Sequence, residues 1–331
     1  MNNIIPNCLI DLHLHLDGSL SLDAVKNIAL HDNINIPSND NELKEALTLQ
    51  KGCKNLNEYL KRFDLPISIL QSSYALQYAT EDLCNRLHDI GCIYAEIRYA
   101  PQKHCQKGLS QEVSIKAVLN GIKNSPIPCG LILCCMREGW ENSKENLKTV
   151  NLAVKYQDFG VYGLDLAGAE ALYPNEIYKD LFTAIKNTSL PYTIHSGEAL
   201  GAKSVDIAID YGAKRIGHGI RAYEDKNTLK RIVENNIPLE FCPTSNINTF
   251  IFEDYKDIPI LEYMQKGAII TLNSDNMSIS DTDIRQEFNI IKNTLNLSNQ
   301  DIKNLLLNSA KSSFADEGTK KKLISKIDQC F

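Results

Sequence analysis

Eight short apolar segments, each rich in residues that favour β-strands, recur along this chain with helix-like segments between them. They occupy residues 8–14, 92–99, 130–136, 161–167, 191–195, 214–217, 238–242 and 268–273. Strands of a parallel sheet that is covered on both faces are nearly continuous apolar runs, and residues 130–136 are the clearest case. Eight such strands alternating with helices predict an α/β fold, a (β/α)8 TIM barrel.

Glycines support this alternation. Gly91, Gly212 and Gly267 each stand where a helix-like segment ends and an apolar segment follows, as expected when glycine takes the left-handed position after a helix. A doubly wound open sheet is the alternative fold. It is disfavoured because no G-x-G-x-x-G or P-loop glycine pattern follows an early strand.

The length of 331 residues suits one barrel, so we expect a single domain over residues 1–331. The net charge of −6, with no basic cluster among aromatic residues, argues against nucleic-acid binding. The N-terminus lacks the features of a signal peptide and no apolar run reaches the length of a membrane span, which predicts a soluble, cytoplasmic protein without a membrane partner. The ten cysteines form no C-x-x-C, and we expect them to be reduced core residues.

Residues 20–66, between the first two predicted strands, are too many for a simple crossover. Four apolar residues of this insertion are spaced as on one face of a helix: Leu56, Tyr59, Leu60 and Phe63. This spacing predicts an amphipathic helix. The helix could pack on the outside of the barrel, or the segment could be a helical lid over the barrel mouth.

Polar residues follow several predicted strands at their C-terminal ends, where barrel enzymes carry their active sites. His13 and His15 end the first strand, His195 the fifth and His218 the sixth, and Asp275 follows the eighth. His13 and His15 point the same way because side chains repeat every two residues along a strand. The remaining histidines lie in helical or loop segments, and we expect them to have surface or structural roles: His31, His88 and His104.

Imidazoles and a carboxylate that converge at a barrel mouth match the ligands of a borderline metal such as zinc, with a position left for water. Bound zinc lowers the pKa of its water to roughly 7 and so supplies hydroxide at neutral pH. Glu198, three residues after His195, could then supply a proton to the substrate. Its alternative role is a capping carboxylate at the N-terminus of the helix that follows.

The ordered motifs of this chain resemble those of the adenosine deaminase family, in the amidohydrolase superfamily, over most of the sequence. They begin with His13-Leu-His-Leu-Asp-Gly-Ser19 and include Ala95-Glu-Ile-Arg-Tyr-Ala-Pro101, Cys134-Cys-Met-Arg137, Asp165-Leu-Ala-Gly168, His195-Ser-Gly-Glu198, Gly217-His-Gly219 and Cys242-Pro-Thr-Ser-Asn246. The resemblance implies a cytoplasmic purine-salvage enzyme with one Zn²⁺ per chain, which hydrolyses adenosine to inosine and ammonia.

The same resemblance implies roles for individual residues. Zinc would be held by His13, His15, His195 and Asp275. Glu198 would protonate purine N1, while His218 and Asp275 would orient and deprotonate the attacking water.

Substrate binding would involve further residues. The Gly168 N–H would meet purine N3, and Asp17 would meet the ribose 5′-hydroxyl. The hydrophobic gate of family members is matched by Leu56, Tyr59, Leu60 and Phe63. Asn276 stands where many members carry an aspartate that contacts N7, and its amide NH₂ can donate directly to N7.

The chain also departs from the family pattern at Ser196, where alanine is usual, and at Ala169, where aspartate is frequent. The closest alternative function is another aminohydrolase that acts on adenine, a modified adenosine, aminodeoxyfutalosine or AMP. A catalytically inactive binding barrel is disfavoured because all the ligand and proton-transfer residues are present. The cytidine-type zinc deaminases are excluded because their H-x-E and P-C-x-x-C elements are absent.

Overall fold

A computed structural model of the chain describes residues 5–49, 53 and 55–331. In that part of the chain, eight parallel strands form two sheets in chain order, β1 to β4 and β5 to β8. The strands are β1 (Leu9–His15), β2 (Cys92–Tyr99), β3 (Cys129–Arg137), β4 (Val161–Gly168), β5 (Thr193–Ser196), β6 (Arg215–His218), β7 (Leu239–Phe241) and β8 (Ile270–Leu272). Single bridges, Leu14 to Asp275 and Leu164 to Tyr192, join the two sheets into a barrel.

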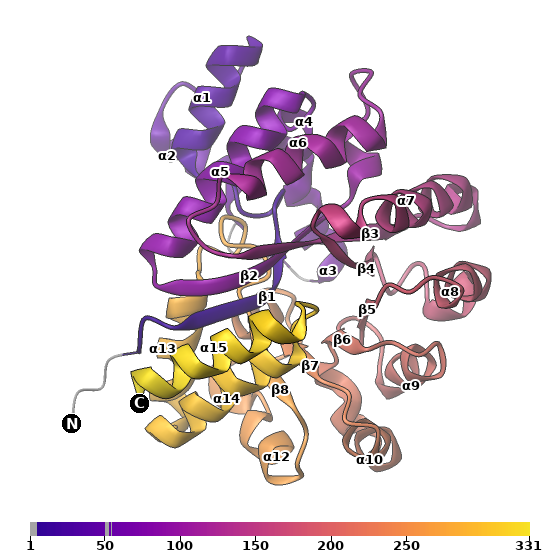
Figure 1. The fold of residues 1–331 in the computed structure, drawn as a ribbon, viewed down its shortest axis with the longest axis vertical. Helices are drawn as coiled ribbons and strands as arrows, with labels where there is room; N and C mark the ends of the chain where they lie inside the picture. The colour runs from indigo at the N-terminus through magenta and orange to yellow at the C-terminus, as the bar shows by residue number, and fades with distance from the viewer. Residues whose placement is uncertain (1–4, 50–52, 54) are drawn as a thin grey trace.

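Helices surround the strands on the outside of the barrel (Figure 1). The α-helices are α1 (Leu22–Asp32), α2 (Asp40–Leu47), α3 (Leu56–Leu60), α4 (Asp64–Ile69), α5 (Ser73–Asp89), α6 (Gln111–Lys123), α7 (Ser143–Lys155), α8 (Lys179–Lys186), α9 (Ala202–Asp210), α10 (Lys226–Glu234), α11 (Pro243–Asn248), α12 (Ile260–Gln265), α13 (Ile284–Leu295), α14 (Asn299–Ser312) and α15 (Glu317–Cys330). Short 3-10 helices include η1 (Lys61–Phe63), η2 (Pro101–His104), η3 (Trp140–Asn142) and η5 (Asn175–Tyr178).

The predicted (β/α)8 barrel is confirmed, because each predicted strand segment holds one observed strand whose ends differ by at most two residues. Gly91, Gly212 and Gly267 have positive φ angles of 83°, 84° and 83°, as expected for the position after a helix. No helix in the described ranges is long and apolar enough to cross a bilayer. Among the cysteines, Cys92, Cys134 and Cys135 are buried with free thiols.

The insertion between β1 and β2 is helical, and its α3 and η1 pack over the barrel mouth rather than on the main core. Leu56 and Tyr59 form a small apolar cluster with Cys53 and Ile279, and Leu60 and Phe63 pack against it. Residues 50–52 and 54 of the predicted segment 20–66 lie outside the described residues, as do residues 1–4. The closing of this segment as a lid stays a prediction.

A buried carboxylate connects α13 to the start of α11. Glu287 accepts hydrogen bonds from the Thr244 backbone N–H at 3.1 Å and from the Thr282 hydroxyl at 2.7 Å. Burial raises the pKa of Glu287 from 4.5 to about 7, although these hydrogen bonds oppose the rise. The protonated form is therefore favoured by folding. The contribution of Glu287 to stability is fully present below pH 4.5 and is lost as the pH rises through 7.

We predict that Glu287→Gln changes the pH dependence of stability. Glutamine carries no titratable proton, so the free energy of unfolding of the variant should improve relative to wild type by about 2 kcal/mol between pH 5 and pH 8. Urea unfolding at both pH values measures this difference, with the exposed Glu253→Gln as control. Parallel pH dependence of Glu287→Gln and wild type would contradict the prediction.

Candidate functional site

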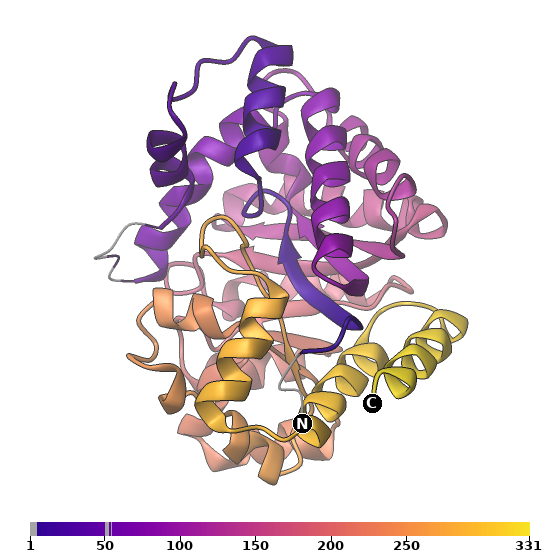
Figure 2. The same ribbon diagram turned by 90° about the vertical axis from the view of Figure 1, so that its left-hand side faces the viewer.

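The predicted site residues come together where the barrel closes. Residues of β1 and the segment after β8 are joined by backbone hydrogen bonds, from His15 N–H to Asp275 O at 2.7 Å and from Asp275 N–H to His13 O at 2.8 Å. Figure 2 shows the indigo β1 beside orange segments from the C-terminal half of the chain, which include the segment after β8. His195 lies near the C-terminal end of β5, the first strand of the second sheet, and His218 is the last residue of the adjacent β6. Closure of the barrel therefore assembles this cluster.

The Nε2 atoms of the cluster point at a common centre. His15 Nε2 lies 3.3 Å from His195 Nε2 and 3.5 Å from Asp275 Oδ1. His13 Nε2 lies 3.6 Å from the same Asp275 oxygen and is buried with no hydrogen-bond partner among the described residues. Ligand atoms of the three histidines lie within 4.8 Å of one another. Convergent imidazole nitrogens with a carboxylate oxygen form a donor set suited to a divalent transition metal.

The opposite nitrogens of two rings are held by buried carboxylates. His13 Nδ1 lies 2.7 Å from Glu240 Oε2, and His195 Nδ1 lies 2.9 Å from Asp165 Oδ2. A carboxylate at Nδ1 fixes the proton there and leaves Nε2 as the basic atom, which is the usual support of a histidine that binds metal. The geometry thus orients both rings for coordination through Nε2.

Ionic contacts extend below the histidines through the barrel interior. The Arg98 guanidinium lies 2.8 Å from Asp165 and 3.0 Å from Glu240, and Arg215 lies 2.6 Å from both Glu240 and Glu96. We call these residues the interior charge network, and each is at most 1% exposed. Burial opposes ionisation of Glu240, but Arg98 and Arg215 hold its pKa well below the usual range.

Electrostatics within the cluster favour neutral imidazoles at His15 and His195 and an ionised Asp275. Burial lowers the pKa of His15 to about 3 and also lowers that of His195. Burial and Arg98 likewise oppose protonation of His13, but contacts with Asp275 and Glu240 raise its pKa. The pKa of Asp275 is held well below its usual range by His13 and its neighbours, against the effect of burial.

Glu198 and His218 face each other beside the cluster, with Glu198 Oε2 3.6 Å from His218 Nε2. Burial, together with the charges of Asp275 and Glu170, raises the pKa of Glu198 well above 4.5 and so favours its protonated form. Burial lowers the pKa of His218 well below 6.5, so its imidazole is neutral. A proton donor and a proton acceptor therefore stand side by side.

Two residues of the site have a strained backbone conformation. His218 has φ +58° and Asp275 has φ +59°, a left-handed conformation that costs energy for residues other than glycine. Gly217 packs between two histidines, and a Cβ there would lie 3.1 Å from His195 Cα and 3.2 Å from His13 Cε1. The Gly217-His218-Gly219 motif thus lets the imidazoles approach closely while His218 turns into the site.

Glu170 is a site residue that the sequence analysis missed. Its carboxylate accepts hydrogen bonds from the backbone of the loop after β5, at Gly197 (2.8 Å), Glu198 (3.2 Å), Ala199 (2.7 Å) and Leu200 (3.0 Å). The Ser204 hydroxyl donates to it as well, at 2.5 Å. Glu170 thereby does for this loop what a capping carboxylate would do, which leaves the Glu198 side chain free to point into the site.

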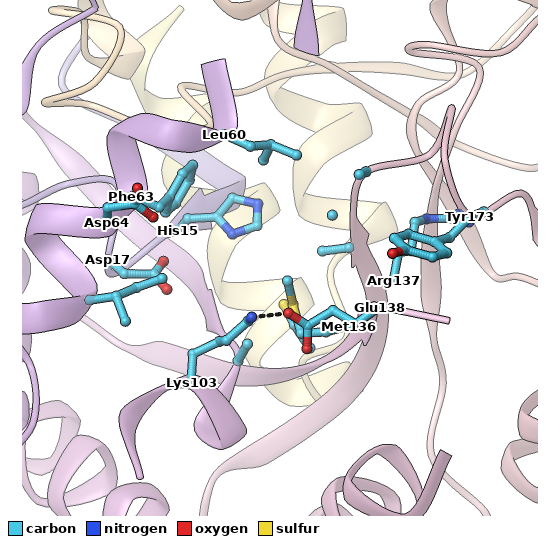
Figure 3. A pocket seen from close by; sticks show the side chains of 16 residues that line it. His15, Asp17, Leu60, Phe63, Asp64, Lys103, Met136, Arg137, Glu138 and Tyr173 are labelled. Carbon is cyan, nitrogen blue, oxygen red and sulfur yellow. Dashed lines mark hydrogen bonds and ion pairs between the residues drawn. The ribbon is translucent and has the colours of Figure 1, made fainter. Parts of the chain in front are cut away.

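An inner and an outer pocket lead to the cluster. The inner pocket, a cavity of about 40 Å³, is lined by His15, Leu56, Tyr59, Leu60, Phe63, Ala167, Gly168, His195, Glu198, His218, Asp275 and Asn276. The outer pocket, of about 370 Å³, shares His15, Leu60, Phe63, Ala167 and Gly168 with it. The outer pocket also carries charged and polar side chains toward the surface (Figure 3). The predicted residues from α3 and η1 thus lie over the cluster.

The remaining predicted substrate residues lie in these pockets. Asp17 lines the outer pocket, with its Oδ2 3.4 Å from His104 Nε2, and Gly168 lines both pockets. The Asn276 amide donates to the Tyr59 hydroxyl at 3.0 Å, so one predicted gate residue already contacts it. Its Oδ1 lies against Gly18, where a Cβ would be 1.8 Å away.

The sequence does contain a signal for other missed residues, namely charged residues inside predicted buried strands. Glu96, Arg98, Asp165, Arg215 and Glu240 interrupt segments that are otherwise apolar, and a charge in the middle of a buried strand requires a partner. That signal indicates an interior network without giving its pairs.

Comparisons with known proteins agree on one family. The family model described as adenosine deaminase matches residues 8–330. An adenosine deaminase of Haemophilus ducreyi is 42% identical over 330 residues, which covers 97% of this chain and 96% of that protein.

Solved structures share the fold. An adenine deaminase from Arthrobacter aurescens superposes with a TM-score of 0.89 at 26% identity, covering 98% of this chain and 99% of that chain. An N6-methyl-AMP deaminase from Arabidopsis thaliana superposes with a TM-score of 0.82 at 22% identity, covering 98% and 97%.

We predict that Glu170→Gln loosens the loop that carries Glu198. An amide in place of the carboxylate loses the charge-assisted hydrogen bonds and turns donors toward backbone N–H groups. Hydrogen exchange of the amides at residues 197–200 should accelerate by about 10- to 100-fold, with Glu176→Gln as an exposed control in the neighbouring η5. Unchanged protection of these amides would show that other contacts hold the loop.

Proposed function

This chain belongs to the adenosine deaminase family and is a hydrolase that acts on carbon–nitrogen bonds, and we propose that it converts adenosine and water to inosine and ammonia. We expect 2′-deoxyadenosine to react as well. The observation that carries the proposal is the convergence of His13, His15, His195 and Asp275 in a pocket that Glu198 also lines. The substrate would be a purine nucleoside, a small molecule that enters through the outer pocket.

The donor set fits a resident metal, and Zn²⁺ is the proposed ion. His13 Nε2 is buried and unpartnered in the described part of the chain, which is costly unless an ion or water satisfies it. His13, His15, His195 and Asp275 would hold one ion, oriented by Glu240 and Asp165. Such an ion, when bound, lowers the pKa of water to roughly 7.

Glu198 is the proposed proton donor. Attack of water at C6 of the purine moves an electron pair onto N1, and a carboxylic acid beside N1 can protonate that nitrogen as the charge develops. The raised pKa of Glu198 supports this role because it keeps the proton in place before the reaction. The hydrogen bond from the Glu198 backbone N–H to the Glu170 carboxylate supports the position of Glu198.

His218 and Asp275 are the proposed acceptors of the proton that water loses. Neutral His218 and ionised Asp275 are both in the basic form at neutral pH. The accepted proton then passes to the amino group at C6, which leaves as ammonia when the C6–N bond breaks, and the C6 hydroxyl proton restores the carboxylic acid of Glu198.

The pockets support a placement for the substrate. The purine would lie in the inner pocket under Leu56, Tyr59, Leu60 and Phe63, with the Gly168 N–H near N3 and Asn276 near N7. Asp17 in the outer pocket would meet the ribose 5′-hydroxyl. The related fold occurs in deaminases of a free base and of a nucleotide, so substrate choice must depend on such side chains rather than on the barrel.

We predict about one tightly bound divalent ion per chain, because the three imidazoles and one carboxylate form a single donor set. Elemental analysis of the purified protein should find zinc. His15→Ala should lose most of it, while the exposed His88→Ala should keep it. Two ions per chain, or full activity after exhaustive chelation, would contradict the proposal.

We predict that Glu198→Gln keeps the metal but lowers kcat for adenosine by about 10²- to 10⁴-fold, because glutamine cannot deliver the proton. Steady-state ammonia release and elemental analysis on the same preparation measure both quantities. The exposed Glu234→Gln serves as the control. Near-normal turnover, or loss of the metal, would show that Glu198 has another role.

A further inference from the structure

Carboxylates outnumber cations among the charged residues that line the outer pocket. Asp17, Asp64 and Glu138 line it, against the cations Lys103 and Arg137. Figure 3 shows Lys103 and Glu138 extending toward each other, with Asp17 at the left of the view. Lys103 belongs to η2 after β2, and Glu138 directly follows β3. Neighbouring strand ends thus bring this cation and this carboxylate together over the pocket.

Arg137 is already committed to the protein interior. Its guanidinium donates to Tyr173 O at 2.8 Å, to Asn175 Oδ1 at 2.6 Å and to His195 O at 2.6 Å. The side chain is 1% exposed. These bonds hold the strand end that carries His195, so Arg137 cannot turn toward an anion in the outer pocket without releasing it.

Lys103 is bound by Glu138 in an ion pair. Both side chains are partly exposed, 27% for Lys103 and 39% for Glu138, and pairs of this kind contribute little to stability. The main effect of the pair is therefore on the electrostatic potential of the outer pocket. Glu138 cancels the cation in the outer pocket that would otherwise be available to an anion.

We propose that Glu138 is a specificity-determining residue that makes the site reject a 5′-phosphate by occupying Lys103. The inference rests on the proposed function: with the purine in the inner pocket, the ribose 5′ end extends into the outer pocket. A phosphate there meets Asp17, Asp64 and Glu138 with no uncommitted cation among the described pocket residues. A neutral 5′-hydroxyl pays no such repulsion and can donate to Asp17, whose buried Oδ1 has no hydrogen-bond partner in the described chain.

The test compares nucleoside with nucleotide in wild type, Glu138→Gln, Lys103→Met and the double variant. The kcat/KM ratio of AMP to adenosine should rise about tenfold or more in Glu138→Gln, because Lys103 becomes free to pair with phosphate. The gain should disappear in the double variant and shrink at high salt. Glu141→Gln, an exposed residue three positions along the same loop, should leave the ratio as in wild type.

A binding measurement separates this inference from the proposed function. Purine riboside and its 5′-monophosphate lack the 6-amino group, so calorimetry gives their Kd ratio without turnover. That ratio should move toward the phosphate by about tenfold in Glu138→Gln. If wild type fails to deaminate adenosine but the Kd ratio shifts, the proposed function is wrong and the role of Glu138 stands. If adenosine is deaminated while neither ratio shifts, or if the gain persists without Lys103, the role of Glu138 is wrong.

Discussion

The interior charge network is the interaction on which the site depends. Arg98 joins Asp165 to Glu240, and these carboxylates hold His195 and His13 by their Nδ1 atoms. Because the charges are buried, none can lose its partner cheaply, and removing one member of such a pair typically costs about 3–5 kcal/mol. The barrel interior is therefore held together by specific buried ion pairs as well as by apolar packing. These ion pairs fix the direction of the imidazoles above them.

The loops build on this fixed base in a consistent way. Glu170 holds the backbone around Glu198, and Arg137 holds the β5 end through His195 O. Both are buried groups that bind backbone, so they hold the loop and the strand end that carry their neighbours. The side chains proposed to react are thus held in place by contacts outside the pocket's centre, as preorganised electrostatic catalysis would require.

The strands, their order and the strand-end positions of the clustered histidines could be predicted from sequence because each depends on local spacing. Apolar runs and glycines after helices are repeated signals, and His13, His15, His195, His218 and Asp275 all follow from strand ends. The roles of Glu170 and Glu138 could not be predicted, because each depends on a contact between loops that no periodicity encodes. Charges such as Glu240 were visible in the sequence, but which arginine each one meets is set only by barrel closure.

The seam where β1 meets the segment after β8 also bears on how the molecule matures. Asp11 accepts a hydrogen bond from Ser274 at 2.5 Å, and the two residues are separated by 263 positions in sequence. The proposed metal ligands on the two sides of this seam can meet only when the last strand has been synthesised and has docked against the first. A nascent chain or an open barrel would offer His13 and His15 without Asp275. Full coordination would therefore report completed assembly, and metal uptake would select finished molecules.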